Sequence, residues 1–107
     1  MASSARGYWI ARLDIHDQEA YARYRQLNGV AFAKFGGRFL VRGGPYELVK
    51  GEGRQHNVVI EFPSLEAARA CLASEEYQAA LKVLASAGTT DMVVIDGYDG
   101  PQPGDAA

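Results

Sequence analysis

Two pairs of glycines bracket a short apolar segment, and this arrangement constrains the fold more than any other feature of the chain. The sequence there reads Phe35-Gly36-Gly37-Arg38-Phe39-Leu40-Val41-Arg42-Gly43-Gly44-Pro45. Glycine adopts positive φ at no steric cost, so the first pair can end a helix and turn the chain. Residues 39–41 suit a strand, and the second pair followed by proline interrupts its hydrogen-bond ladder. We predict a helix that stops near Phe35, a strand over residues 38–42, and a bulge or kink after it.

Hydrophobic periodicity around this stretch predicts three more strands and two more helical pieces. The strands are expected over residues 8–15, 57–62 and 92–96, and the 38–42 strand resumes over 46–49. Asp17, Ser64 and Ser74 are expected to cap the helices at their N-termini, and Gly88 ends the last one. The strand over 92–96 is apolar at nearly every position, which predicts burial on both faces. The buried stripe of the first helix is predicted to be Ala20, Tyr24, Leu27, Ala31 and Phe35.

This order of elements, βαββαβ with the second helix divided, predicts an α+β ferredoxin-like fold. Its antiparallel sheet should carry the helices on one face, against Trp9, Leu13, Val58, Ile60 and Phe62. The 107 residues suit one domain over residues 7–97, with a disordered N-terminus over 1–6 and a flexible tail over 98–107.

Three motifs in this order resemble the DUF1330 family. They are Gly7-Tyr8-Trp9-Ile10, the segment from Gly36 to Gly44, and the run Val59-Ile60-Glu61-Phe62-Pro63-Ser64-Leu65-Glu66-Ala67-Ala68. The resemblance covers residues 7–97, with Glu75 departing from the Ser-Pro that relatives often carry before the next helix. It implies a ferredoxin-like fold that pairs as a dimeric α+β barrel, and it implies no activity, because the family's function is unknown.

The sheet face without helices is predicted to mix apolar and charged side chains. An apolar wall with a few convergent polar groups suits a pocket between two packed sheets, and a solvated face would be mostly polar. We therefore expect a homodimer built through this face, with a small, anionic ligand or a purely structural charge network between the sheets. The residues assigned to this face are Tyr8, Ile10, Arg12, Asp14, Leu40, Arg42, Val59, Glu61, Met92 and Val94.

Two classes of function follow from this face. In the first, the dimer binds or transforms a small molecule, with Arg12, Arg42, Asp14 and Tyr8 as ligand-binding residues and Glu61 or His16 moving a proton. The fold resembles that of cofactor-independent monooxygenases and small isomerases, which is analogy only. In the second, the protein is a non-catalytic interaction or sensor domain, whose charges only fix the geometry of the dimer.

Composition and motifs argue against several other classes. A net charge of −2 disfavours nucleic-acid binding, and no apolar run approaches a membrane span. The first six residues have no apolar signal region, and Cys71 is the only cysteine, so we expect a cytoplasmic protein without a disulfide. His16 and His56 lack the partners of a metal site, and neither glycine pair forms a phosphate loop, so no metal or cofactor is expected.

Overall fold

The computed structural model describes residues 5–105, and residues 1–4 and 106–107 lie outside the described part of the chain. Most of the predicted disordered N-terminus therefore falls outside it. The elements follow in the predicted order, with the second helix divided at Ser74. They are β1 (Gly7–Ile15), α1 (Gln18–Lys34), β2 (Arg38–Arg42), β3 (His56–Phe62), α2 (Leu65–Ala73), α3 (Glu75–Ala87) and β4 (Gly88–Asp96).

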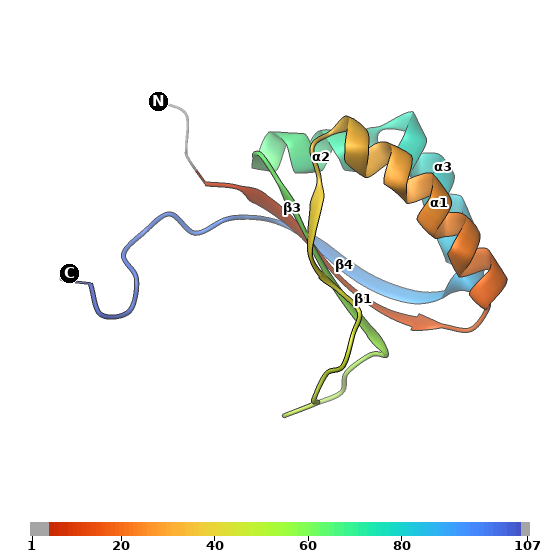
Figure 1. The fold of residues 1–107 in the computed structure, drawn as a ribbon, viewed down its shortest axis with the longest axis horizontal. Coiled ribbons are helices and arrows are strands. Elements are labelled where there is room, and N and C mark those ends of the chain that lie inside the picture. Colours follow the sequence, from red (N-terminus) through yellow and green to blue (C-terminus); the bar gives the residue numbers. More distant parts are fainter. Residues whose placement is uncertain (1–4, 106–107) are drawn as a thin grey trace.

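The four strands form one antiparallel sheet in the order β2-β3-β1-β4. All three helices cover the same face of this sheet, and the other face carries no helix (Figure 1). This two-layer arrangement is the predicted ferredoxin-like fold. The tail from Gly97 to Asp105 contains no helix or strand, and its flexibility stays a prediction.

The predicted caps define where the helices begin. The side chains of Asp17, Ser64 and Ser74 accept hydrogen bonds from the backbone N–H groups of Ala20, Ala67 and Tyr77. At the other end of α1, Gly36 has a φ of 76°, and the N–H of Gly37 donates to the carbonyl of Phe32. The first glycine pair therefore stops the helix and turns the chain into β2, as the sequence predicts.

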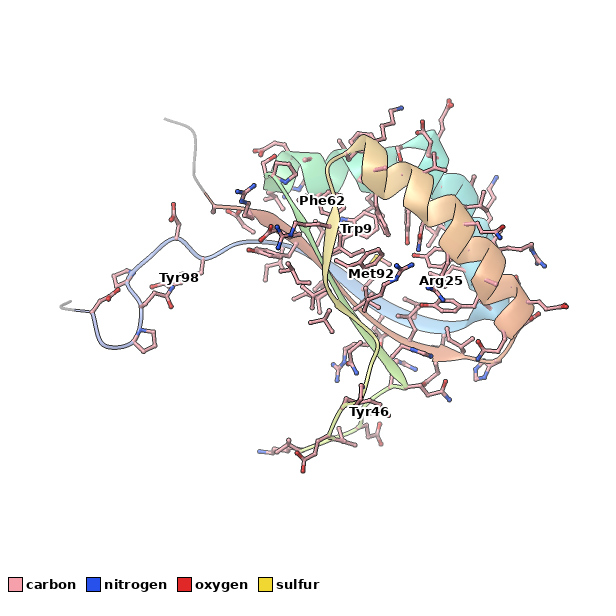
Figure 2. All side chains as sticks on the ribbon, viewed as in Figure 1. Trp9, Arg25, Tyr46, Phe62, Met92 and Tyr98 are labelled. Carbon is pink, nitrogen blue, oxygen red and sulfur yellow. The ribbon has the colours of Figure 1, made fainter. Side chains whose placement is uncertain are left out.

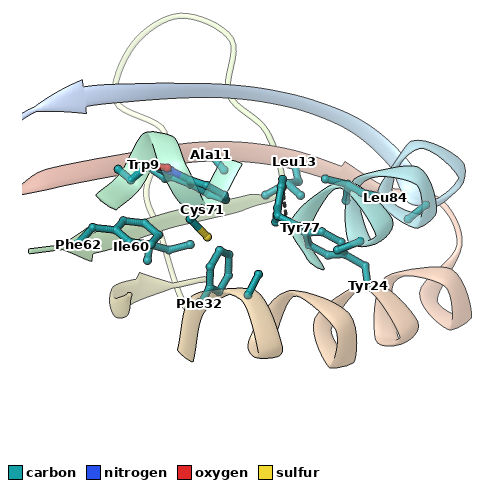
Figure 3. Packing of buried hydrophobic residues seen from close by; sticks show 14 of the residues in the cluster. Trp9, Ala11, Leu13, Tyr24, Phe32, Ile60, Phe62, Cys71, Tyr77 and Leu84 are labelled. Atoms are coloured by element: carbon teal, nitrogen blue, oxygen red, sulfur yellow. Dashed lines mark hydrogen bonds between the residues drawn. The ribbon is translucent and has the colours of Figure 1, made fainter. Parts of the chain in front are cut away.

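The core lies between the helices and the sheet, and aromatic rings dominate it (Figure 3). The Trp9 indole packs against Phe32, Phe62 and Tyr77, with ring centroids 4.6 to 5.4 Å apart. The hydroxyl of Tyr77 shares a hydrogen bond of 2.9 Å with that of Tyr24, so the two buried phenols satisfy each other. The predicted helix-facing strand residues, from Trp9 to Phe62, all belong to this core or pack against it.

Three local predictions were wrong. The buried residues of α1 include Asn28 and Phe32, whereas Leu27 is 38% exposed, because the stripe follows the 3.6-residue period and not the apolar residues alone. No strand resumes over residues 46–49. The last strand was predicted over residues 92–96 with both faces buried. β4 instead begins at Gly88, and its side chains alternate between half-buried and exposed, since the sheet is covered on one face only.

We expect the paired phenols to be coupled in stability. Tyr24→Phe or Tyr77→Phe should each lower the free energy of unfolding by about 1–2 kcal/mol, because each leaves a buried hydroxyl without its partner. The double variant should lose less than the sum of the two. Urea denaturation measures these values, and Tyr98→Phe, at an exposed position, serves as the control with a change below about 0.5 kcal/mol. Additive losses would contradict the coupling.

Candidate functional site

The helix-free face holds most of the predicted site residues, at two separate places. Glu61 lies opposite Tyr8, and Arg12 lies between Asn57 and Asp91 in the paired strands. Tyr8 and Arg12 are four residues apart along β1, which is about 13 Å at the rise of a strand. Glu61 and Arg12 therefore belong to different clusters, and the face does not gather the predicted residues into one site.

The first cluster joins β1, β2 and β3. The Tyr8 hydroxyl donates to a carboxylate oxygen of Glu61 at 3.2 Å, and the Arg38 guanidinium lies 3.6 Å from the other oxygen. Burial raises the pKa of Tyr8, and its hydrogen bond to the Glu61 carboxylate raises it further. Both oxygens of Glu61 are thus occupied by neighbouring side chains, an arrangement that orients the carboxylate.

The second cluster ties a long connection to the sheet. We call residues 43–55, which link β2 to β3, the arm; Figure 1 shows that it projects on the side away from the helices. Arg54 binds Asp14 at 2.8 Å and Asp91 at 2.7 Å. The N–H of Gln55 also donates to Asp14, and this bond, followed by the Arg54 contacts, lowers the pKa of that carboxyl. The ion pairs anchor the base of the arm to β1 and β4.

Arg42 points to the opposite face from the one predicted. β2 pairs Phe39 with Ile60 but Val41 with Val59, so Leu40 is the extra residue of a bulge. A bulge reverses the alternation of the residues that follow it. Arg42 consequently lies on the helix side, with its guanidinium carbon 4.1 Å from the centroid of the Phe39 ring.

The assignment of β4 side chains to the two faces is also corrected. Met92 lies opposite Ala11 and Val94 opposite Trp9, so both face the helices and pack against the core. The helix-free face receives Val93 and Ile95 in their place, 53% and 49% exposed. The sequence left this register open because nearly every residue of the strand is apolar.

The helix side contains a crevice between α1 and the sheet. It contains about 400 Å³ of space free of atoms, including solvent at its mouth, and the centre of a water molecule can reach about 30 Å³ of that space. In this conformation it has room for one or two waters. Its walls are mostly aromatic and aliphatic, and Figure 2 shows Met92 and Arg25 between α1 and the sheet. The lining residues are Trp9, Ala11, Leu13, Tyr21, Tyr24, Arg25, Asn28, Phe32, Phe39, Arg42, Val58, Ile60 and Met92.

Asn28 is the polar group inside this crevice. Asn28 is 5% exposed, and its Oδ1 has no hydrogen-bond partner among residues 5–105. Burial raises the pKa of Tyr24, and hydrogen bonding from Tyr77 and Asn28 opposes the rise. The Asn28 amide is therefore engaged on one side by the Tyr24 hydroxyl and leaves its oxygen unpaired, which costs about 1–3 kcal/mol if nothing else binds there.

The mouth of the crevice carries basic and aromatic side chains from α1, β2 and β3. Arg25 and Arg42 line both the crevice and two surface hollows beside it. His56 lines one of these hollows and packs against the Tyr21 ring with centroids 5.8 Å apart. No carboxylate of the described residues lies within 4.0 Å of Arg25 or Arg42.

The other candidate groups lie elsewhere. His16 is exposed in the turn between β1 and α1. Cys71 is fully buried, and burial raises its pKa to about 12, as expected for an unreactive core thiol. Within residues 5–105, no three His, Cys, Asp or Glu side chains gather where they could hold a metal ion. Over the same range no helix combines the length and hydrophobicity that a membrane span requires.

Sequence reasoning missed Arg25 and Asn28. The signal for Asn28 was present, since it falls four residues after Tyr24 and three before Ala31, in phase with the buried stripe. A polar side chain at such a position must find a partner or face a cavity. Arg25 gave no signal, because an arginine on an exposed turn of a helix is common.

A ferredoxin-like sheet with one covered face defines the fold class, and comparison with known proteins supplies the family. Residues 6–98 match the family described as a domain of unknown function, DUF1330. The chain belongs to this family, as the sequence motifs predicted. No curated protein matches the sequence.

Solved structures confirm the fold. A protein of unknown function from Rhodopseudomonas palustris is 18% identical, with a TM-score of 0.72 over 92% of this chain and 86% of that one. SnoaB, a cofactor-independent oxygenase from Streptomyces nogalater, is 13% identical, with a TM-score of 0.59 over 94% and 99% of the two chains. A dimeric protein of unknown function and ferredoxin-like fold from Bacteroides fragilis is 18% identical, with a TM-score of 0.50 over 87% and 96%.

Removing the ion pairs of Arg54 should release the arm. Arg54→Gln and Asp14→Asn are each expected to speed cleavage by endoproteinase Lys-C after Lys50, the lysine of the arm, while cleavage after Lys34 and Lys82 in the helices stays slow. Because the pKa of Asp14 is lowered by folding, its contacts are fully present above the ordinary value of 3.8 and are lost as the pH falls through the lowered one. Unchanged cleavage after Lys50 in both variants would show that other contacts hold the arm.

Proposed function

We propose that this protein is a homodimeric small-molecule-binding protein whose ligand enters the crevice between α1 and the sheet. The unpaired, buried oxygen of Asn28 is the observation that carries the proposal. A buried polar atom without a partner is rare, and in a crevice that opens to solvent a ligand donor group can supply the missing hydrogen bond. The apolar walls around it suit a ligand with a hydrophobic body.

Ligand entry requires movement at the mouth. The space reached by a water centre is about 30 Å³, too small for an organic molecule. Arg25 and Arg42 are exposed, and Met92 is an unbranched side chain that repacks readily. The proposal therefore includes displacement of these three side chains when the ligand binds, while the backbone keeps its place.

The helix-free face is proposed as the contact between two copies of the chain. It exposes Ile10 of β1, Val41 of β2, and Val93 and Ile95 of β4 to solvent in the single chain. Soluble monomers rarely expose a contiguous apolar patch of more than a few hundred Å². The dimeric Bacteroides fragilis neighbour has the same fold, which supports pairing of this kind.

In this proposal the charged clusters of the helix-free face serve the dimer. Glu61 is held by Tyr8 and Arg38, and Asp14 by Arg54, so these groups orient the contact and border its apolar centre. Arg12 faces the same side and lines the hollows beneath the arm. A single buried thiol, Cys71, fits the reducing cytoplasm, which is the proposed location.

A cofactor-independent oxygenase is the second candidate. SnoaB, a cofactor-independent oxygenase, shares the fold over nearly the whole of both chains. The two guanidinium groups at the crevice could stabilise an enolate or phenolate formed from a bound substrate. Any reaction that passes through such an anion requires this stabilisation. Oxygen uptake in the presence of a bound, acidic organic compound tests this candidate, and binding without uptake favours the first.

Asn28→Leu tests the crevice directly. The leucine side chain has the same number of heavy atoms and removes the unpaired oxygen, which offsets the lost hydrogen bond to Tyr24, so the free energy of unfolding should change by less than about 2 kcal/mol. Binding of small hydroxyl-bearing aromatic compounds, followed by chemical shifts of α1 and β2 amides, should fall at least tenfold. A variant that loses more than 2 kcal/mol would mean that the amide is a structural group whose bonds are already satisfied.

If the helix-free face is the dimer contact, two valine-to-lysine substitutions should affect dimerisation differently. Val93→Lys places a charge on the helix-free face, beside Ile10, and should shift sedimentation from dimer toward monomer, or unfold the protein. Val30→Lys, at a position on α1 that is 60% exposed, should leave the dimer intact. A wild-type protein that sediments as a monomer at micromolar concentrations would refute this contact.

A further inference from the structure

We infer that the crevice takes an organic monoanion: a carboxylate on an apolar, ring-sized body that carries a hydroxyl at its far end. This inference rests on the proposed function, because it names the chemical class of the ligand for the same crevice. Three features of the crevice support it: the positive charge at its mouth, its apolar walls, and the unpaired hydrogen-bond acceptor of Asn28.

The charge of the mouth is positive and has no internal counter-ion. Arg38 and Arg54 each have an acidic partner within 4.0 Å, whereas Arg25 and Arg42 have none among residues 5–105. These two arginines come from different elements and line the same three recesses. The whole chain has a net charge of −2, so this basic pair is a local feature that favours an anion.

The Arg42 side chain is held over an aromatic wall of the crevice. Its guanidinium carbon lies 4.1 Å from the centroid of the Phe39 ring, and Phe39 lines the crevice beside Phe32. Stacking on a ring leaves the edge of the guanidinium free to donate hydrogen bonds. A carboxylate is the group that such an edge binds with two parallel bonds.

Arg25 and Asn28 give the proposed ligand its orientation along α1. Arg25 and Asn28 are three residues apart on the helix, so their Cβ atoms are about 5–6 Å apart on one side of it. In the proposed pose one ring lies along this side of α1, with the carboxylate toward Arg25 and Arg42 and the opposite substituent toward Asn28. Because the free atom of Asn28 is its carbonyl oxygen, the opposite substituent must be a donor, and a hydroxyl meets that need.

Three commercial compounds separate these features. 4-Hydroxybenzoate has the carboxylate and the hydroxyl, benzoate lacks the hydroxyl, and 4-hydroxybenzamide replaces the anion by a neutral amide. Titration of the full-length protein at pH 7 and low salt, followed by amide chemical shifts and calorimetry, gives the affinity for each. We expect 4-hydroxybenzoate to bind best and each of the other two to bind about tenfold more weakly.

Variants assign the effects to residues. Arg25→Gln and Arg42→Gln should each weaken 4-hydroxybenzoate about tenfold and leave 4-hydroxybenzamide unchanged, because only the anion needs the charge. Arg23→Gln, at an exposed position on the same helix as Arg25, is the matched control and should change the affinity for neither compound. Asn28→Leu should lower the affinity for 4-hydroxybenzoate and leave the affinity for benzoate unchanged, because only the first compound has the hydroxyl.

The outcomes distinguish the two proposals. Equal affinity for 4-hydroxybenzoate and 4-hydroxybenzamide, unaffected by Arg25→Gln and Arg42→Gln, would overturn the anion inference and keep ligand binding in the crevice. Shifts confined to the helix-free face or the arm would overturn both, as would the absence of binding by all three compounds at concentrations up to about 10 mM. The inference is supported if Arg25→Gln and Arg42→Gln weaken the binding of 4-hydroxybenzoate and the control variant does not.

Discussion

The packing of the Trp9 indole ring is the interaction on which the rest of the fold depends. The ring lies against Phe32 of α1, Phe62 of β3 and Tyr77 of α3, and its Nε1 donates a 3.0 Å hydrogen bond to the carbonyl of Ala68 in α2. One side chain of the central strand β1 thereby touches all three helices and the neighbouring strand. Its position fixes the distance between the layers, and so the width of the crevice that it also lines.

A single extra residue in β2 decides what the two faces of the sheet can do. The bulge at Leu40 turns Val41 toward the helix-free face and Arg42 toward the helices. The open face thus gains an apolar side chain and loses a charge, while the crevice gains a guanidinium next to Arg25. Both changes follow from the reversed alternation of one edge strand, because the period of a strand is two residues.

The two faces of the sheet therefore carry separate tasks in our proposal. The helix side supplies an enclosed, largely apolar space with one unpaired amide oxygen and a basic mouth. The open side supplies an apolar surface bordered by ion pairs, with the arm projecting beside it (Figure 2). Neighbouring structures share this fold at low identity, so the fold accommodates different sites, and function must be argued from the side chains.

The sequence by itself determined the order of the elements and the family to which the chain belongs. It also determined the helix caps at Asp17, Ser64 and Ser74 and the end of α1 at Gly36. All of these depend on short-range patterns that one or a few residues specify. It also placed Trp9 and Phe62 in the core through simple alternation. Only the tertiary structure decided the direction of Arg42, the register of Met92 and Val94, and the pairing of Asp14 with Arg54. These depend on which strands meet and where a residue is inserted, and the free energies that settle such a register come from contacts between segments far apart in the chain.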